Sequence, residues 1–215
     1  MILNMRRNGL ILGAFALAAT SLLLLTQQLT ADRIAEQERR ELLLTLNELI
    51  PPASHDNDLY ADCTLATAPD SLGLSAPQPV YRARQGNEPV ALALRTTAPD
   101  GYSGHIHLLV AIDTAAVVQG VRVLQHRETP GLGDKIELSR DDWILSFDGE
   151  QVRGPDDPRW TVRRDGGDFD QFTGATITPR AVINAVQRTV LYAEERLDSL
   201  FAAPRECHAG AVTDE

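Results

Sequence analysis

A cluster of hydroxyl groups stands near the C-terminal end of this 215-residue chain. It comes directly before a long segment whose apolar residues form one stripe. The stretch DQFTGATITPRAV, residues 170 to 182, holds three threonines: Thr173, Thr176 and Thr178. Gly174 and Ala175 have almost no side chain, so the hydroxyls are open to a bulky group. Thr178 and Pro179 suit the N-cap and first position of a helix. A helix N-terminus favours a phosphate, but the same pattern is also that of a plain capped helix.

A glycine-containing stretch, HRETPGLGDKI (residues 126 to 136), is the second candidate. Pro130 fixes its φ angle, whereas Gly131 and Gly133 allow positive φ or a close approach of a ligand to the backbone. Leu132 between them is expected to point outward. A planar ligand would fit against such a backbone. The alternative is a type II turn between a strand and a helix, since a lone GLG is a weak signal for phosphate.

Little else in the sequence indicates catalysis or metal binding. No G-x-S-x-G motif occurs, and Cys63 and Cys207 lie outside any metal-binding pattern, so they either pair in an oxidising compartment or stay as thiols. His105 and His107 share one strand face without a third ligand, which favours a solvated face over a metal site. The sequence gives no role to three further histidines: His55, His126 and His208. We expect no catalytic residue and no metal on this chain.

The charge balance argues against nucleic acid as a partner. The chain has 20 basic and 30 acidic residues, a formal net charge of -10, and no block rich in Lys or Arg. Binding to nucleic acid usually needs a basic surface.

The N-terminal region is expected to form a transmembrane helix within residues 1–31. The uncharged run from Asn8 to Ala31 is long enough to cross a bilayer. A cleaved signal peptide is the alternative, but its apolar core is usually shorter and its cleavage site better than Leu29-Thr30-Ala31. Arg6 and Arg7 ahead of the run favour a soluble part outside the cytoplasm.

An amphipathic stalk and linker are expected over residues 32–78. Apolar residues at helical spacing predict a helix that ends at Pro51 and Pro52, and loops follow. Alternating apolar residues then predict three strands, at residues 90–94, 106–112 and 121–123. A turn is expected at Pro99-Asp100-Gly101.

Beyond the strands we expect three elements, namely a short helix, a β-like stretch and a final amphipathic helix, at Asp134–Arg140, Trp143–Val152 and Pro179–Phe201. The predicted fold class is α+β: an N-terminal transmembrane helix followed by a mostly antiparallel sheet packed against helices. The folded domain is expected over residues 79–201, with a tail at 202–215.

Three motifs together resemble one known family. Residues 170–178, read as D-x-x-T-G-A-T-x-T, match the flavinylation motif D-x-x-[ST]-G-A-[ST]-x-[ST] of FMN-binding domains. GYSGHIHLLVAID (101 to 113) and HRETPGLGDKI are similar to signatures of the G subunit of the Rnf (Rsx) electron-transport complex. The resemblance covers roughly residues 1 to 200. Thr173 stands where the family usually has Ser, which keeps the hydroxyl.

The resemblance implies FMN joined through a phosphoester to Thr178 by a flavin transferase that uses FAD and recognises Asp170. It implies cofactor contacts at Thr178, Thr176, Thr173, Gly174, Ala175, Thr129, Gly131, Leu132 and Tyr102. It further implies a flavoprotein subunit that relays electrons among the other subunits of a ferredoxin/NAD oxidoreductase complex that moves ions. Such a subunit would cross the inner membrane once, with its domain in the periplasm.

Two alternatives are open. The C subunit of the sodium-translocating NADH:quinone reductase shares the motif and topology. A non-redox assembly subunit would use the threonine stretch only to cap a helix.

Overall fold

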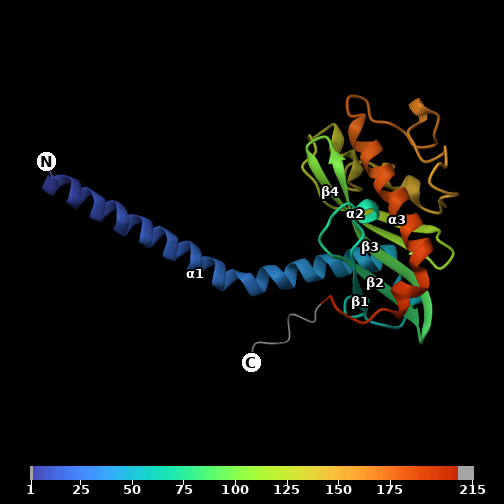
Figure 1. Ribbon diagram of the computed structural model, residues 1–215, viewed down its shortest axis with the longest axis horizontal. Helices are drawn as coiled ribbons and strands as arrows, with labels where there is room; N and C mark the ends of the chain where they lie inside the picture. Colours follow the sequence, from blue (N-terminus) through green and yellow to red (C-terminus); the bar gives the residue numbers. More distant parts are fainter. Residues whose placement is uncertain (1, 208–215) are drawn as a thin grey trace. The chain divides into compact units, whose positions relative to one another are not determined.

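A computed structural model describes residues 2–207 of the chain (Figure 1). His208 and the rest of the predicted tail, residues 208–215, lie outside the described residues. The chain divides into two compact units, Met1–Leu44 and Thr45–Glu215.

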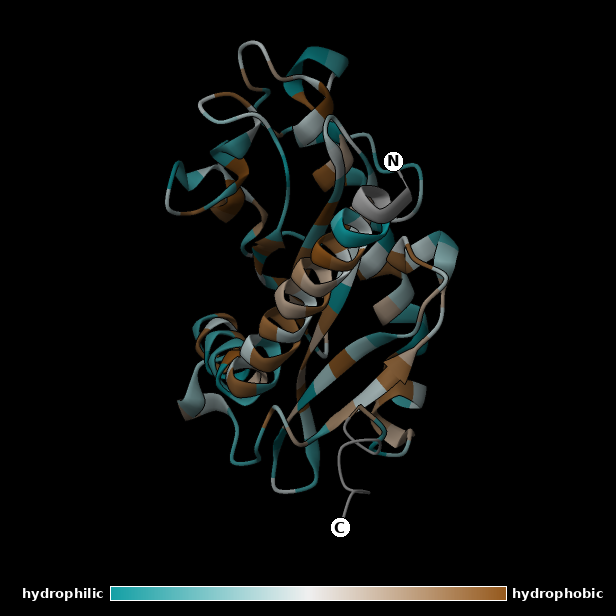
Figure 2. Cartoon of the chain, turned by 90° about the vertical axis from the view of Figure 1, so that its left-hand side faces the viewer, coloured by the Kyte–Doolittle hydropathy of each residue, from teal (hydrophilic) through white to brown (hydrophobic). Residues whose placement is uncertain are grey.

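Helix α1 runs without a break from Ile2 to Leu49. It ends just before Pro51 and Pro52, as predicted, because proline cannot supply the N–H of a continuing helix. Figure 2 shows that its first half is mostly apolar and that its later turns mix polar and apolar residues. Within residues 2–207 it is the one helix long and apolar enough to cross a membrane, judged by length and composition.

A five-stranded sheet forms the centre of the second unit. Its strands are β1 (Cys63–Ala66), β2 (Gln78–Gln85), β3 (Glu88–Gly101), β4 (Gly104–Asp113) and β5 (Val118–Gln125). All neighbours are antiparallel in the order β1-β2-β3-β4-β5. In the longest pairing, Leu94 of β3 lies opposite Val110 of β4, and both are fully buried.

Helix α3 (Ile177–Ala202) packs against β3 and β4. Its predicted stripe is buried at Val182, Ile183, Val186, Val190, Ala193 and Leu200. Short helices complete the unit: η1 (Pro52–Ser54), α2 (Pro69–Leu72), η2 (Gly133–Ile136), η3 (Asp142–Phe147) and η4 (Arg163–Asp165). The α+β prediction is confirmed.

Strands β1 and β2 were not predicted from the sequence, and one turn was misplaced. Strand β2 contains Arg82 and Arg84. These charged residues interrupt the alternation of apolar residues from which a strand is predicted. Strand β3 continues through the predicted turn as far as Gly101, because the register shifts after Ala98 and accommodates Pro99, which has no N–H to pair. The chain reverses instead at residues 102–103.

For the segment after β5, one predicted element was too long and another was wrong. The helix expected from Asp134 to Arg140 is only the single turn η2. The β-like stretch from Trp143 is the 3-10 helix η3, whose N-cap Asp141 accepts a hydrogen bond from the backbone N–H of Trp143. Trp143, Ile144 and Phe147 are buried while the residues between them are exposed, which is a helical rather than an alternating pattern.

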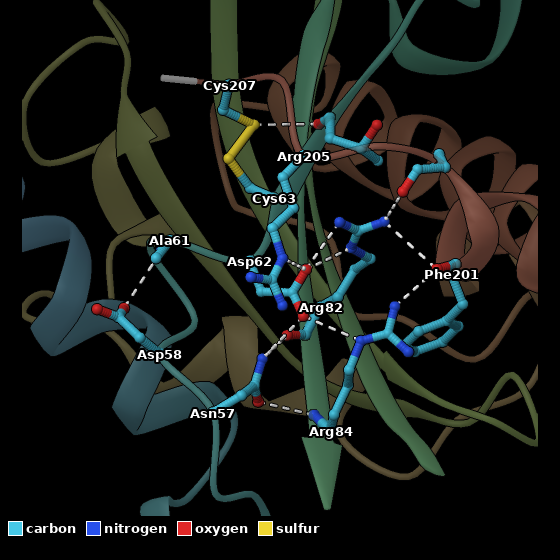
Figure 3. Close-up of polar contacts among 12 residues, drawn as sticks. Asn57, Asp58, Ala61, Asp62, Cys63, Arg82, Arg84, Phe201, Arg205 and Cys207 are labelled. Atoms are coloured by element: carbon cyan, nitrogen blue, oxygen red, sulfur yellow. Dashed lines mark hydrogen bonds and ion pairs between the residues drawn. A yellow bond between two sulfur atoms is a disulfide. The ribbon is translucent and has the colours of Figure 1, made fainter. Parts of the chain in front are cut away.

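The C-terminal end of α3 is held by a buried ion cluster (Figure 3). Asp62 accepts from Nε of Arg82 and of Arg84, at 2.9 Å each. The two guanidinium groups also donate to backbone carbonyls at the helix end, including that of Phe201. Such carbonyls have no partner within the helix, so the arginines satisfy them.

A disulfide joins Cys63 of β1 to Cys207, beyond the end of α3. The two cysteines, whose pairing the sequence left open, therefore close a loop with a sequence separation of 144.

Candidate functional site

A cavity of about 370 Å³ lies where three segments of the second unit meet. These are the turn between β3 and β4, the glycine loop after β5, and the threonine stretch that leads into α3. Its lining residues are Tyr102, Glu128, Thr129, Leu132, Gly133, Gly174, Ala175, Thr176, Ile177 and Thr178. The two stretches singled out by their sequence thus face each other across one cavity.

Thr178 lies in the first turn of α3 rather than at its cap. The helix begins at Ile177, and its N-cap is Thr176, whose side chain makes no capping hydrogen bond. The predicted N-cap at Thr178 was therefore wrong by two residues. The physical reason is that the Thr178 hydroxyl donates to the carboxylate of Glu128 instead of turning back to its own backbone. Thr178 still lies among the free N–H groups of the first helical turn.

Glu128 is a site residue that was not identified from the sequence. The residue is 4% exposed, and the two oxygens of its carboxylate have different partners. Oε2 accepts from the Thr178 hydroxyl, and Oε1 accepts from the backbone N–H of Ser103 at 2.9 Å. The carboxylate therefore ties the β3–β4 turn, the glycine loop and α3 together. The available signal was an acidic residue directly before the Thr-Pro-Gly turn of the loop.

The loop needs glycine at position 133 because the neighbouring side chains leave no room for another one. A Cβ at this position would lie 2.9 Å from Oε2 of Glu128 and 3.0 Å from Oγ1 of Thr178. Any side chain at position 133 would therefore force Glu128 or Thr178 to shift. Gly131 and Gly174 instead adopt positive φ angles, of 78° and 84°, that few other residues tolerate.

His126 fixes the start of the loop. Its Nδ1 accepts from the backbone N–H of Glu128, and its Nε2 lies 2.6 Å from Oε1 of Glu137. This hydrogen bond from His126 is the main reason that the pKa of Glu137 falls below its usual value. The loop backbone is thus anchored by a residue that does not line the cavity.

The other residues predicted from the resemblance, except Gly131, divide between two hollows. Those that line the cavity are Tyr102, Thr129, Leu132, Gly174, Ala175 and Thr176. Gly131 belongs to the loop but not to the lining. Thr173 and Asp170 line a neighbouring hollow of about 500 Å³. There the carboxylate of Asp170 pairs with Arg163 at 2.7 Å, and both side chains are largely exposed.

The predicted histidine pair lies outside the cavity. His105 and His107 line a separate hollow with His126 and Arg127. His107 is within 2.9 Å of the Thr97 hydroxyl, and burial lowers its pKa, as do the nearby Arg95 and His105. Among residues 2–207, no group of three or more His, Cys, Asp or Glu side chains is arranged to hold a metal ion.

The fold and the cavity define the class of protein. Residues 101–190, which contain all three segments around the cavity, match the family model of the FMN-binding domain. Residues 1–49, essentially helix α1, match the model of the RnfG N-terminal region.

Curated relatives identify the family more closely. The G subunit of the ion-translocating oxidoreductase complex of Shewanella amazonensis is 50% identical over 97% of both chains. The proteins of the same name from Shewanella loihica and Vibrio parahaemolyticus are each 51% identical, over 94% and 96% of this chain and 95% and 98% of their own. The chain belongs to this family, the G subunits of ion-translocating oxidoreductase complexes. The quinone-reductase alternative is set aside by this assignment.

Proposed function

We propose that this chain is a membrane-anchored flavoprotein subunit that relays electrons through one FMN, joined by a phosphoester to Oγ1 of Thr178. The observation that carries the proposal is the position of Thr178 in the first turn of α3, in the wall of a cavity formed with the glycine loop. The hydroxyl is therefore next to free backbone N–H groups that suit a phosphate.

The residues around the cavity fit a flavin. Gly133 and Gly174 add no side chain to the lining, while Tyr102, Leu132 and Ile177 present exposed apolar surface at 68%, 41% and 47%. A planar ring system would cover this surface, whose exposure otherwise costs free energy. FMN supplies one- and two-electron redox chemistry, while this chain's residues hold and orient it.

The proposed partners are the remaining subunits of an ion-translocating ferredoxin/NAD oxidoreductase complex, together with a flavin transferase that attaches the cofactor. Asp170, exposed beside Thr173 in the neighbouring hollow, is proposed to be a recognition element for that transferase. Its side chain is largely exposed although it pairs with Arg163, so a second protein can reach it.

We place the chain in the inner membrane, crossing it once through α1, with the domain in the periplasm. The disulfide between Cys63 and Cys207 supports this side, because disulfides persist in the oxidising periplasm and not in the cytoplasm. A covalent link also keeps a cofactor that would otherwise diffuse away outside the cytoplasm.

In-gel flavin fluorescence tests the attachment point. The full chain is produced together with a flavin transferase and run on a denaturing gel. We expect a fluorescent band for the wild type and none for Thr178→Ala, because alanine lacks the oxygen that forms the ester.

Ser199→Ala is the control, because it removes a hydroxyl near the other end of α3, outside the cavity and the motif. It is expected to keep a fluorescent band. A band that survives in Thr178→Ala would refute the assignment. No band in any sample, wild type included, would favour a non-redox assembly subunit.

A further inference from the structure

A hollow of about 340 Å³ lies beside the cavity that is proposed to hold FMN. Its lining residues are Ser103, Gly104, His105, His107, Gln125, His126 and Arg127. Among the described residues, none that lines this basic hollow is acidic, although the chain has 30 acidic residues and a formal net charge of -10. We propose that the basic hollow is the docking site for a carboxylate-rich surface of the subunit that exchanges electrons with the flavin. The identity of that partner rests on the proposed function, whereas the chemistry of the surface does not.

The basic hollow presents side-chain donors that no described residue occupies. His105 and Arg127 are both exposed, and neither side chain makes a hydrogen bond or an ion pair with any residue from 2 to 207. A guanidinium carries five N–H donors in a planar fork that fits a carboxylate, and an imidazole ring donates through a further N–H. A guanidinium and an imidazole that are open to solvent in one hollow therefore suit the carboxylates of a second protein.

The adjoining face of the sheet adds positive charge. His107 of β4 lies opposite Thr97 of β3, so Arg95, two positions before Thr97, is on the same face. Burial is the largest cause that lowers the pKa of His107, and the positive charge of Arg95 lowers it further. The carboxylate of Glu137, which reaches this region from the end of η2, is already paired with His126. An acidic partner would therefore meet a surface of complementary charge.

The basic hollow and the cavity share one wall. Tyr102 and Glu128 line the cavity, while the residues beside them in the sequence, Ser103 and Arg127, line the hollow. The backbone N–H of Ser103 donates to Oε1 of Glu128 at 2.9 Å and joins the two segments of this wall. Because electron transfer slows steeply with the distance between cofactors, a partner that docks here is well placed to exchange electrons with a flavin in the cavity. Complementary charge also speeds the encounter and selects the correct partner.

Carbodiimide cross-linking in the assembled complex tests the proposal. The chain contains a single lysine, Lys135, which lines a different hollow. Arg127→Lys keeps the positive charge and supplies an amine, which carbodiimide joins to a carboxylate only where the two groups touch. Membranes from cells that produce this variant with the other subunits are treated and run on a denaturing gel. We expect a new band at the summed mass of this chain and one other subunit, with the link on an Asp or Glu of that subunit.

Two further variants show whether the product is specific to the basic hollow. Arg153→Lys is the matched control, because it places the same amine at another exposed arginine, in a separate hollow. Its yield of the cross-linked band is expected to be at least fivefold lower than that of Arg127→Lys. His105→Lys introduces the amine at a second exposed position of the basic hollow and should give a band with the same subunit. This variant decides the matter if Arg127→Lys does not assemble.

Three results would overturn the docking site. One is the absence of a band in both Arg127→Lys and His105→Lys, as expected if the phosphate of a lipid fills the hollow, because a phosphate forms no such link. The others are an equal yield in Arg153→Lys and a link that stays within the chain. In-gel flavin fluorescence of the same samples keeps the two proposals apart. A fluorescent chain without the cross-link retains the proposed function and loses the docking site, whereas a cross-linked chain without fluorescence retains the acidic partner and loses the electron relay.

Discussion

Replacing Asp62 by alanine is expected to lower the free energy of unfolding by about 3–5 kcal/mol, the usual loss when one partner of a buried ion pair is removed. Asp62 is 2% exposed and Arg82 is 1% exposed, and their charged groups lie 2.7 Å apart. Without the carboxylate, the Arg82 guanidinium stays buried with only backbone carbonyls around it (Figure 3). Urea unfolding of the detergent-solubilised chain, followed by the emission of Trp143 and Trp160, measures the loss.

Asp165→Ala is the matched control, because Asp165 also pairs with an arginine, Arg180, but at the surface. A much smaller loss is expected there, since water screens exposed ion pairs. Equal losses in the two variants would show that burial does not set the strength of the Asp62 cluster.

The same cluster predicts how stability depends on pH. Burial alone would raise the pKa of Asp62, but the positive charge of Arg82, with Arg84 and Arg205, outweighs it and lowers the pKa below its ordinary value. A carboxyl whose pKa is lower in the folded state stabilises the fold above its unfolded pKa, about 3.9. That stability is lost as pH falls through the folded pKa. In Asp62→Ala this acid-dependent component should be absent.

Removing the disulfide is the second large expected effect. Replacing Cys63 and Cys207 together by alanine should cost about 2–5 kcal/mol of unfolding free energy, because the bond closes a long loop and restricts the unfolded chain. Urea unfolding with and without a reductant measures the effect. The reductant should destabilise the wild type by the same amount and leave the double variant unchanged.

If the reductant does not change the unfolding free energy of the wild type, the two thiols are not bonded in the isolated protein. That result would also withdraw the support that the disulfide gives to a periplasmic location.

The sequence predicted the elements whose signal is local. Alternation of apolar residues located β3, β4 and β5, and the stripe of Val182, Val186 and Val190 located α3. Prediction failed where a distant partner decides the structure. Strand β2 was missed because the partners of Arg82, namely Asp62 and the end of α3, lie far away in the sequence.

The candidate site was likewise predicted where the signal is local and missed where a distant contact decides the structure. The two stretches that line the cavity were identified from their small and hydroxyl residues, but how they meet was not. Glu128 was not identified because its role depends on a contact with Thr178, which lies fifty positions further along the sequence. Because of the same contact, Thr178 lies in the first turn of the helix and not at its N-cap. The capping rules consider only neighbouring residues, so they did not predict this position.

Intact mass of the full chain extracted from its native membranes tests the central claim most directly. We expect a single species heavier than the disulfide-bonded chain by one FMN less one water, with the increment on the tryptic peptide that contains Thr178. A chain of unmodified mass, from cells shown to contain an active flavin transferase, would contradict the proposed attachment, as would an increment carried by any other residue.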